Sequence, residues 1–143
     1  VLLTGHSRGY VKAGLERLGV DYYHFNLDDY EQISKFYRML DLYLITSREE
    51  GGPRAVFESM ASGIPLVTTK VGQAMDVVVH ERNGWMVDVG DVDGLLDCAI
   101  SVYENNLNLA EVLYNARSTA ELNSYESQYE QWTDFMTGFV EID

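Results

Sequence analysis

Short apolar runs alternate along this chain with segments whose apolar side chains recur every three or four residues. The short runs predict β-strands, and the recurring pattern predicts amphipathic helices. The expected strands cover residues 1–4, 21–25, 41–46, 64–68 and 85–87. The expected helices lie near residues 8–18, 30–39, 53–62, 73–80, 91–104, 108–122 and 125–139.

Residues with strong preferences at helix ends support these bounds. Gly63 and Pro65 follow the helix expected at 53–62, which is a usual pairing just beyond a helix C-terminus. Asp91 is expected to cap the helix that follows it, because a carboxylate there accepts hydrogen bonds from unpaired amides. The run 41–46 is apolar on both faces and is expected to be a central parallel strand.

The last expected helix carries an apolar face of its own. Tyr125, Tyr129, Trp132 and Met136 recur at helical spacing. We expect this face to pack against the core of the same domain. The alternative is an exposed face that covers another part of the protein.

The alternation of strands and helices with short loops predicts an α/β, Rossmann-like fold. Such a fold has a parallel sheet with helices on both faces and right-handed crossovers, here followed by a helical C-terminus. Ligands of these sheets bind beyond the carboxyl ends of the strands. Since three of the loops lie at those ends, Asn26, Glu50 and Gly72 are expected to converge on one crevice.

Composition narrows the possible classes of protein. The chain has 143 residues, a formal net charge of −13 and a hydrophobic fraction of 46%, which predicts one globular domain spanning 1–143. The charge argues against nucleic acid and anionic membranes as partners, because both attract Lys and Arg. No apolar run approaches the ~18 residues of a transmembrane helix, and no signal peptide is evident. Cys98, the only cysteine, is expected to be a small core residue of a cytoplasmic protein.

The stretch 50–58, Glu-Gly-Gly-Pro-Arg-Ala-Val-Phe-Glu, places two carboxylates on either side of a helix start. Gly51 and Gly52 let the backbone approach a ligand closely, and Pro53 suits the first helical position. The unpaired amides that follow form a positive helix end for an anionic or oxygen-rich ligand. A rise of ~1.5 Å per residue gives roughly 8 Å between the carboxylates, which suits a nucleotide-sugar.

These residues also have simpler interpretations. Taken alone, Glu50 is more typical of a surface charge that favours the helix dipole by ~0.3–1 kcal/mol. Glu58 lies at the edge of an apolar stripe, where an unpaired carboxylate is costly, so a specific partner is expected. Arg48, Arg54 and Lys70 are individually typical of solvated charges, and as a group they are candidate phosphate contacts.

Three motifs follow one another along the chain. Residues 47–67 contain two glutamates, Glu50 and Glu58, in an E-x7-E pattern. Residues 71–78, Val-Gly-Gln-Ala-Met-Asp-Val-Val, match a loop of the form G-G-x-x-E-x-V, and residues 82–87 match an N-G-hydrophobic strand. In this order the motifs resemble the signatures of the retaining GT-B glycosyltransferases, the large group 1 family. The resemblance covers nearly all of the chain.

The resemblance implies the C-terminal, donor-binding half of a GT-B fold. It implies that the chain binds a nucleotide-diphosphate sugar and that the enzyme transfers the hexose to an acceptor with retention of configuration. It assigns the donor sugar to Glu50, the catalytic candidate, and the ribose diol to Glu58. The other implied substrate-binding residues are Gly51, Gly52, Pro53, Arg54, Gly72 and Gln73, with Phe25, Asn26 and Leu27 against the base. No metal or other cofactor is expected, because basic residues and helix ends stabilise the leaving group.

The chain departs from the family pattern in places. Pro53 stands where Gly is usual, which removes one amide donor, and Asp76 stands where Glu is more common. The chain opens on Val1 as if within a buried strand, so we expect further sequence upstream. The family's basic diphosphate ligands and the N-terminal acceptor-binding domain are expected there, and this part alone is expected to be inactive.

Two other functions remain open on the sequence. One is a non-catalytic nucleotide-sugar-binding or interaction domain of the same fold, and the intact pair Glu50 and Glu58 argues against it because an interaction scaffold has no use for the two carboxylates. The other is a GT-B-type nucleotide-sugar epimerase, which would need acid and base residues that are not evident. A Rossmann dehydrogenase is disfavoured because no G-x-G-x-x-G follows the first strand.

Overall fold

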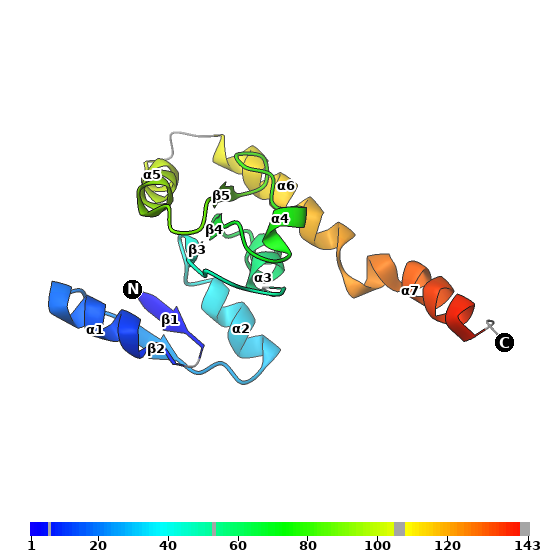
Figure 1. The fold of residues 1–143 in the computed structure, drawn as a ribbon, viewed down its shortest axis with the longest axis horizontal. Helices are drawn as coiled ribbons and strands as arrows, with labels where there is room; N and C mark the ends of the chain where they lie inside the picture. The colour runs from blue at the N-terminus through cyan, green and yellow to red at the C-terminus, as the bar shows by residue number, and fades with distance from the viewer. Residues whose placement is uncertain (6, 53, 105–107, 141–143) are drawn as a thin grey trace. The chain divides into compact units, whose positions relative to one another are not determined.

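The computed structural model describes residues 1–5, 7–52, 54–104 and 108–140. The chain divides into two compact units, Val1–Leu40 and Asp41–Asp143. Hydrogen bonds group the strands into a sheet of order β1-β2 and a sheet of order β3-β4-β5 (Figure 1). Every strand pair in these sheets is parallel, as the sequence predicts.

The unit Val1–Leu40 consists of two strand–helix repeats. Its elements are β1 (Leu2–Thr4), α1 (Gly9–Leu18), β2 (Tyr23–Phe25) and α2 (Tyr30–Tyr37). α1 ends at Gly19, whose φ of +67° suits a residue without a Cβ. α2 is capped by Asp29, whose carboxylate accepts a 2.8 Å hydrogen bond from the Gln32 amide.

The unit Asp41–Asp143 contains the three-stranded sheet and the helices that follow its strands. Its strands are β3 (Tyr43–Ile45), β4 (Leu66–Thr69) and β5 (Trp85–Val87). Its helices are α3 (Arg54–Ser62), α4 (Ala74–Val77), α5 (Val92–Tyr103), α6 (Leu109–Leu122) and α7 (Tyr125–Val140). Every expected strand and helix corresponds to one of these elements. The expected caps are confirmed, since Gly63 takes a φ of +70° and Asp91 accepts from the Gly94 amide at 2.9 Å.

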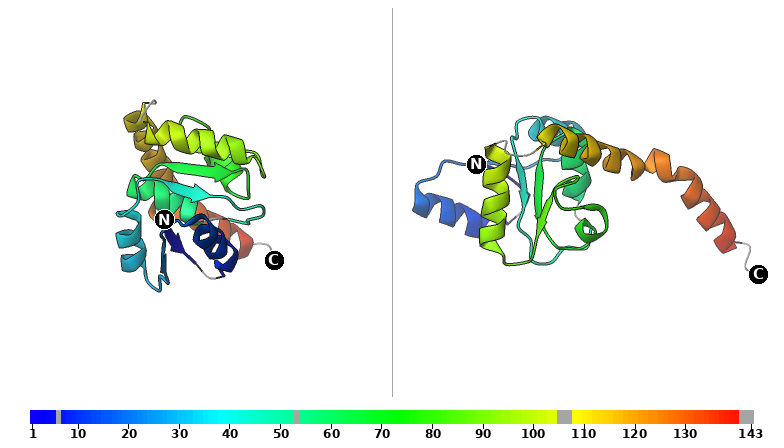
Figure 2. Two further views of the ribbon diagram at one scale, coloured as in Figure 1. Left: turned by 90° about the vertical axis from the view of Figure 1, so that its left-hand side faces the viewer. Right: turned by 90° about the horizontal axis from the view of Figure 1, so that it is seen from above.

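Helices cover both faces of the β3-β4-β5 sheet. On one face Leu66 of β4 packs with Met60 of α3, and on the other Val67 of β4 packs with Val102 of α5. Successive residues of β4 therefore belong to opposite cores, as the two-residue alternation of a strand requires. The right-hand view of Figure 2 shows α5 on one side of this sheet and α3 on the other.

The prediction that 41–46 is a central strand buried on both faces is wrong. β3 is at the edge of its three-stranded sheet, and β4 is the fully buried centre. The side chain of Leu44 is 49% exposed. Leu44 is paired with Val67, on the face that α5 covers, but α5 packs on β4 and β5 and so leaves this position of β3 partly open.

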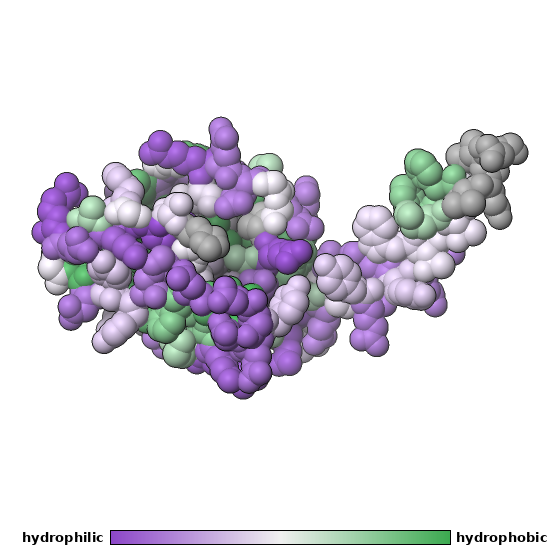
Figure 3. All heavy atoms as spheres, turned by 90° about the horizontal axis from the view of Figure 1, so that it is seen from below, coloured by the Kyte–Doolittle hydropathy of each residue, from purple (hydrophilic) through white to green (hydrophobic). Residues whose placement is uncertain are grey.

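The prediction that the apolar face of α7 packs in the core is also wrong. Tyr125, Tyr129, Trp132 and Met136 are between 58% and 88% exposed. The buried residues Ala116 and Ala120 of α6 already fill that side of the core, and α7 continues beyond the end of α6 (Figure 1). In Figure 3 apolar side chains, drawn in green, lie on the surface next to the grey C-terminal residues. Like the other helices in the described parts of the chain, α7 does not meet the length and apolarity needed to cross a membrane.

Cys98 lies on the inner side of α5. It packs at the edge of the core formed by Val67, Trp85, Val102 and Val112. Desolvation raises the pKa of its thiol, with smaller contributions from nearby carboxylates, so the reactive thiolate is disfavoured. This confirms the expectation that Cys98 is a small core residue.

Candidate functional site

The two motif glutamates lie on either side of the start of α3. Glu50 is exposed in the loop after β3, and Glu58 is half-buried within α3. α3 begins at Arg54, after the glycine pair and Pro53, which lies outside the described residues. Val56 and Met60 are buried at 1% and 0% exposure, and they fix the helix against the sheet. The loop-then-helix arrangement that the sequence predicts is therefore present.

Thr69, at the carboxyl end of β4, ties this loop to the sheet. Its side chain is 1% exposed, and its hydroxyl donates a 2.6 Å hydrogen bond to the carbonyl oxygen of Ser47. The Ser47 hydroxyl in turn donates to Oε1 of Glu50 at 3.0 Å. A chain of two hydrogen bonds thus runs from the buried end of β4 to the exposed carboxylate of Glu50.

Gly72 brings the loop after β4 against the loop after β3. A Cβ built on Gly72 would overlap the carbonyl oxygens of both Glu50 and Gly51, and Gly72 has a φ of +44°. The adjacent Gln73 amide donates a 3.3 Å hydrogen bond to the Gly51 carbonyl. Position 72 therefore requires glycine both for its backbone conformation and for its close approach. The predicted convergence is confirmed for Glu50 and Gly72, and it remains a prediction for Asn26, which belongs to the unit Val1–Leu40.

The side chain of Gln73 lies beside the glycine pair. A Cβ built on Gly52 would be 3.6 Å from Oε1 of Gln73, which is ordinary van der Waals contact. Gln73, Gly51 and Gly52 are all exposed. Together with Glu50 they form an open surface at the carboxyl ends of β3 and β4, with carboxylate, amide and backbone groups available to a ligand.

The other predicted ligand contacts lie on β2 and the loop after it, at the start of α3, and directly after β4. In the unit Val1–Leu40, Phe25 ends β2 and Asn26 and Leu27 follow it, and the place of these three residues against the base remains a prediction. Arg54 is exposed at the start of α3. Lys70 forms a 2.6 Å salt bridge with Asp88, with side-chain exposures of 47% and 75%, and its role as a phosphate contact remains a prediction.

Asn83, in the third motif, has a structural role. It is 5% exposed, and its amide nitrogen donates to the Val77 carbonyl at 2.9 Å and to the Thr119 hydroxyl at 3.0 Å. Its Oδ1 accepts a 2.8 Å hydrogen bond from the Val79 amide. These bonds join the turn before β5 to α6, which explains why an asparagine precedes the glycine of this motif.

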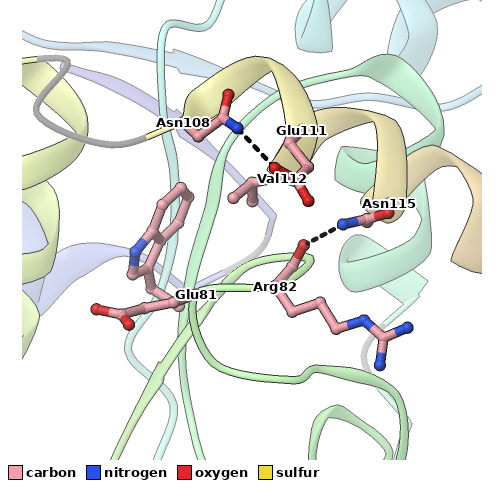
Figure 4. Close-up of a pocket in the computed structure, with 7 residues that line it drawn as sticks. Glu81, Arg82, Asn108, Glu111, Val112 and Asn115 are labelled. Carbon is pink, nitrogen blue, oxygen red and sulfur yellow. Dashed lines mark hydrogen bonds between the residues drawn. The ribbon is translucent and has the colours of Figure 1, made fainter.

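Two cavities lie against α6 rather than at the Glu50 surface. The first has a volume of about 310 Å³ and the second about 400 Å³. Figure 4 shows the first, where Asn108 donates to Glu111 and Asn115 donates to the Arg82 carbonyl. The linings of the two cavities share Arg82 and Asn115 and include none of the predicted substrate-binding residues.

The Glu50 surface has the chemistry of a polyhydroxylated, anionic ligand site. Carboxylates accept hydrogen bonds from sugar hydroxyls, and the first amides of a helix favour phosphate oxygens. Among the residues that the structure describes, no cluster of His, Cys, Asp or Glu is arranged to hold a metal ion.

Comparison with known proteins gives a family match and several relatives. A sequence model of the family described as "Glycosyl transferases group 1" matches residues 14–119. The N-acetyl-alpha-D-glucosaminyl L-malate synthase of Bacillus anthracis is 30% identical over 107 residues, which is 69% of this chain and 28% of that protein. The lipopolysaccharide core biosynthesis mannosyltransferase LpsB of Rhizobium meliloti is 30% identical over 115 residues, which is 78% of this chain and 31% of that protein.

Solved structures share the fold. The sucrose-phosphate synthase of Thermosynechococcus elongatus superposes with a TM-score of 0.87 at 18% identity, over 99% of this chain and 39% of that one. Anabaena Alr3699/HepE in complex with UDP-glucose gives 0.83 at 24% identity, over 96% of this chain and 40% of that one. The chain thus spans less than half the length of each of these proteins.

Proposed function

Because the chain belongs to the group 1 glycosyl transferases, we propose that it is the donor-binding half of such an enzyme. The complete protein transfers a hexose from a nucleotide-diphosphate sugar to an acceptor and retains the configuration at the anomeric carbon. An N-terminal domain outside this sequence binds the acceptor. The present chain alone binds donor without catalysing transfer.

The observation that carries this proposal is the contact between the Glu50 loop and the Gly72 turn. The two loops leave the carboxyl ends of neighbouring parallel strands, where ligands of such sheets bind. Glycine at position 72 lets the backbones approach until a side chain would no longer fit. The result is a compact surface in which Glu50, the glycine pair and Gln73 face one ligand.

The proposed roles follow from position along α3. Glu50, ahead of the helix, accepts hydrogen bonds from hydroxyls of the donor sugar. The first amides of α3, with Arg54 beside them, bind the diphosphate. Glu58, farther along the helix, accepts from the two ribose hydroxyls, a charge-assisted contact that typically contributes ~1.5–3 kcal/mol. Phe25, Asn26 and Leu27 lie against the base.

In the reaction, the site stabilises charge rather than forming a bond to the sugar. The glycosidic bond to the diphosphate lengthens, so positive charge develops at the anomeric carbon and negative charge on the leaving phosphate. A fixed carboxylate at Glu50 stabilises the positive charge at the anomeric carbon. The start of α3, with its basic neighbours, stabilises the negative charge on the leaving phosphate. Both contacts are strongest in the transition state and therefore raise kcat.

The similar proteins are associated with different donor sugars, so they support a sugar transferase in general and do not identify the sugar that this one transfers. LpsB is named a mannosyltransferase, and HepE was solved with UDP-glucose. The proposal is tested by titrating UDP, GDP and ADP into the complete protein, and then following transfer from the matching sugar nucleotides by NMR of the anomeric proton. Binding of one nucleotide and a product of unchanged anomeric configuration are expected. Absence of nucleotide binding would contradict the proposal.

A further inference from the structure

We propose that Thr69 and Ser47 are positioning residues that hold the carboxylate of Glu50 toward the donor sugar. The inference rests on the proposed function for its catalytic consequence, but the positioning itself is a property of the folded chain. Neither residue is among those that the sequence motifs assign to substrate binding. Both act through Glu50 and need not touch the substrate.

The relay consists of two hydrogen bonds, Thr69 to Ser47 and Ser47 to Glu50, and the first of them is part-buried. Thr69 is 1% exposed at the carboxyl end of β4, and its hydroxyl reaches across to the backbone that leaves β3. The 2.6 Å hydrogen bond to the Ser47 carbonyl is short for a hydroxyl donor. The bond joins buried Thr69 to half-buried Ser47, and removing the Thr69 hydroxyl takes this partner from the Ser47 carbonyl. Thr69 therefore fixes the backbone of Ser47 relative to the sheet.

The second hydrogen bond of the relay lies at the surface. From this fixed backbone, the Ser47 hydroxyl donates to Oε1 of Glu50 at 3.0 Å. Oε2 of Glu50 is left to accept from a ligand. A glutamate that is exposed in a loop would otherwise occupy several rotamers, and ordering it on binding would cost about 1–2 kcal/mol of side-chain entropy. The relay orders this side chain before the donor arrives.

The Gly72 turn restricts the same loop from the other side. The carbonyls of Glu50 and Gly51 lie against the Gly72 α-carbon, and the Gln73 amide donates to Gly51. The loop is thus held at its beginning by Thr69 and at its end by the Gly72 turn. The Ser47 hydroxyl, however, is the group that bonds to the Glu50 side chain itself, and Thr69 acts on it through the Ser47 backbone.

Thr68 provides a matched control on the same strand. It is 0% exposed, and its hydroxyl also donates to a backbone carbonyl, that of Thr69, at 3.0 Å. It is paired with Ile45 and Met86 in register, and its hydroxyl donates to its own strand rather than to the loop that begins at Ser47. Replacing Thr68 by Val therefore tests the loss of a buried hydroxyl from β4 without loss of the relay.

The experiment compares Thr69→Val, Thr69→Ser and Thr68→Val in the complete enzyme. The measurements are kcat, the Kd for the nucleoside diphosphate and hydrogen exchange of the amides in 47–51. Thr69→Val is expected to lower kcat by about threefold to tenfold, the effect of one lost hydrogen bond, with the Kd changed less than twofold. In Thr69→Val, hydrogen exchange of the loop amides is expected to rise. Thr69→Ser is expected to restore kcat and loop exchange to wild-type values, and Thr68→Val is expected to leave both unchanged.

Introducing Thr69→Val into the Glu50→Gln variant separates an effect on the position of Glu50 from a general loss of structure. If Thr69 acts through Glu50, then Thr69→Val should lower kcat no further there. An equal loss in both backgrounds, or unchanged loop exchange in Thr69→Val, would overturn the proposal. If Thr69→Val does not fold, Ser47→Ala removes only the exposed second bond and is judged by the same kcat loss and the same background test. A wild-type protein without nucleotide binding or transfer would refute the proposed function, while loop exchange would still decide the positioning.

Discussion

Gly72 lies so close to Glu50 that a single added carbon at position 72 would overlap the Glu50 carbonyl oxygen. The two residues belong to loops that leave different strands, β3 and β4, and are far apart in sequence. Their contact makes one surface out of two motifs that the sequence presents separately. It also makes the position of Glu50 sensitive to a residue that contributes no side chain.

We expect Gly72→Ala to destabilise the protein by more than ~2 kcal/mol and to weaken nucleotide binding. A left-handed backbone costs a residue with a Cβ roughly 1–2 kcal/mol, and the overlap with two carbonyls adds to this cost. Gly90→Ala is the control, because Gly90 has a φ of +87° with open space around its Cβ position. Denaturant unfolding measures both variants. Equal losses in the two would mean that the close approach at Gly72 has no energetic consequence.

Glu58→Ala should weaken binding of the nucleoside diphosphate roughly tenfold to a hundredfold. This is the effect of losing one charge-assisted hydrogen bond, ~1.5–3 kcal/mol, between the carboxylate and the ribose. Calorimetry on wild type and variant gives the two affinities. Glu58 has an interaction within the protein as well, so a melting curve must show that the variant is folded at the titration temperature. Matching affinities would remove Glu58 from the ribose site, and Glu130→Ala on exposed α7 serves as a neutral control.

Asn83→Ala should destabilise the protein by about 2–4 kcal/mol. The side chain is buried and its loss leaves the Val79 amide and the Val77 carbonyl without their partner, each at a cost of ~1–3 kcal/mol. Thr119→Val removes the third bond together with the hydroxyl's own bond to the Asn115 carbonyl on α6, and it should cost less, about 1 kcal/mol, because the Val77 and Val79 backbone groups keep their partner. Urea unfolding of both variants checks the order. A loss in Asn83→Ala no greater than in Thr119→Val would show that Asn83 does not hold the turn before β5.

Trp132→Ser should change the free energy of unfolding of this chain by less than ~0.5 kcal/mol. Trp132 is 58% exposed on α7, and surface substitutions away from special features have small effects. Met60→Ala, at a site with 0% exposure, should cost about 2–5 kcal/mol in the same assay. A large loss in Trp132→Ser would mean that the face of α7 is buried in this chain after all.

Much of the fold could be predicted from local patterns. The helix start at 54 and its end before Gly63 follow from glycine and proline preferences, and the Asp91 cap follows from side-chain chemistry. These are signals within a few residues of the feature that they determine. The predicted contact of Glu50 with Gly72 used one further rule, that parallel strands place their carboxyl ends at the same edge.

What the sequence could not predict depends on contacts between distant elements. The apolar run at 41–46 fits a central strand, yet Leu44 is half-exposed because α5 packs on the neighbouring strands. The apolar face of α7 looks like a core face, and only the filling of that core by α6 shows otherwise. The sequence gives one weak indication of the role of Thr69, which is a hydroxyl-bearing residue at the end of an apolar strand. Its bond to Ser47, 22 positions away in the sequence, needed the structure.

The central claim is that Glu50 contacts the donor sugar, and Glu50→Gln in the complete enzyme tests it most directly. The substitution keeps the size of the side chain and removes its charge. We predict that kcat falls at least about tenfold while the Kd of the nucleoside diphosphate, which carries no sugar, changes less than about twofold. The competing interpretation, a surface charge near the start of α3, predicts a modest fall in melting temperature. Normal kcat per folded enzyme, with melting alone reduced, would contradict the account and place the donor sugar elsewhere.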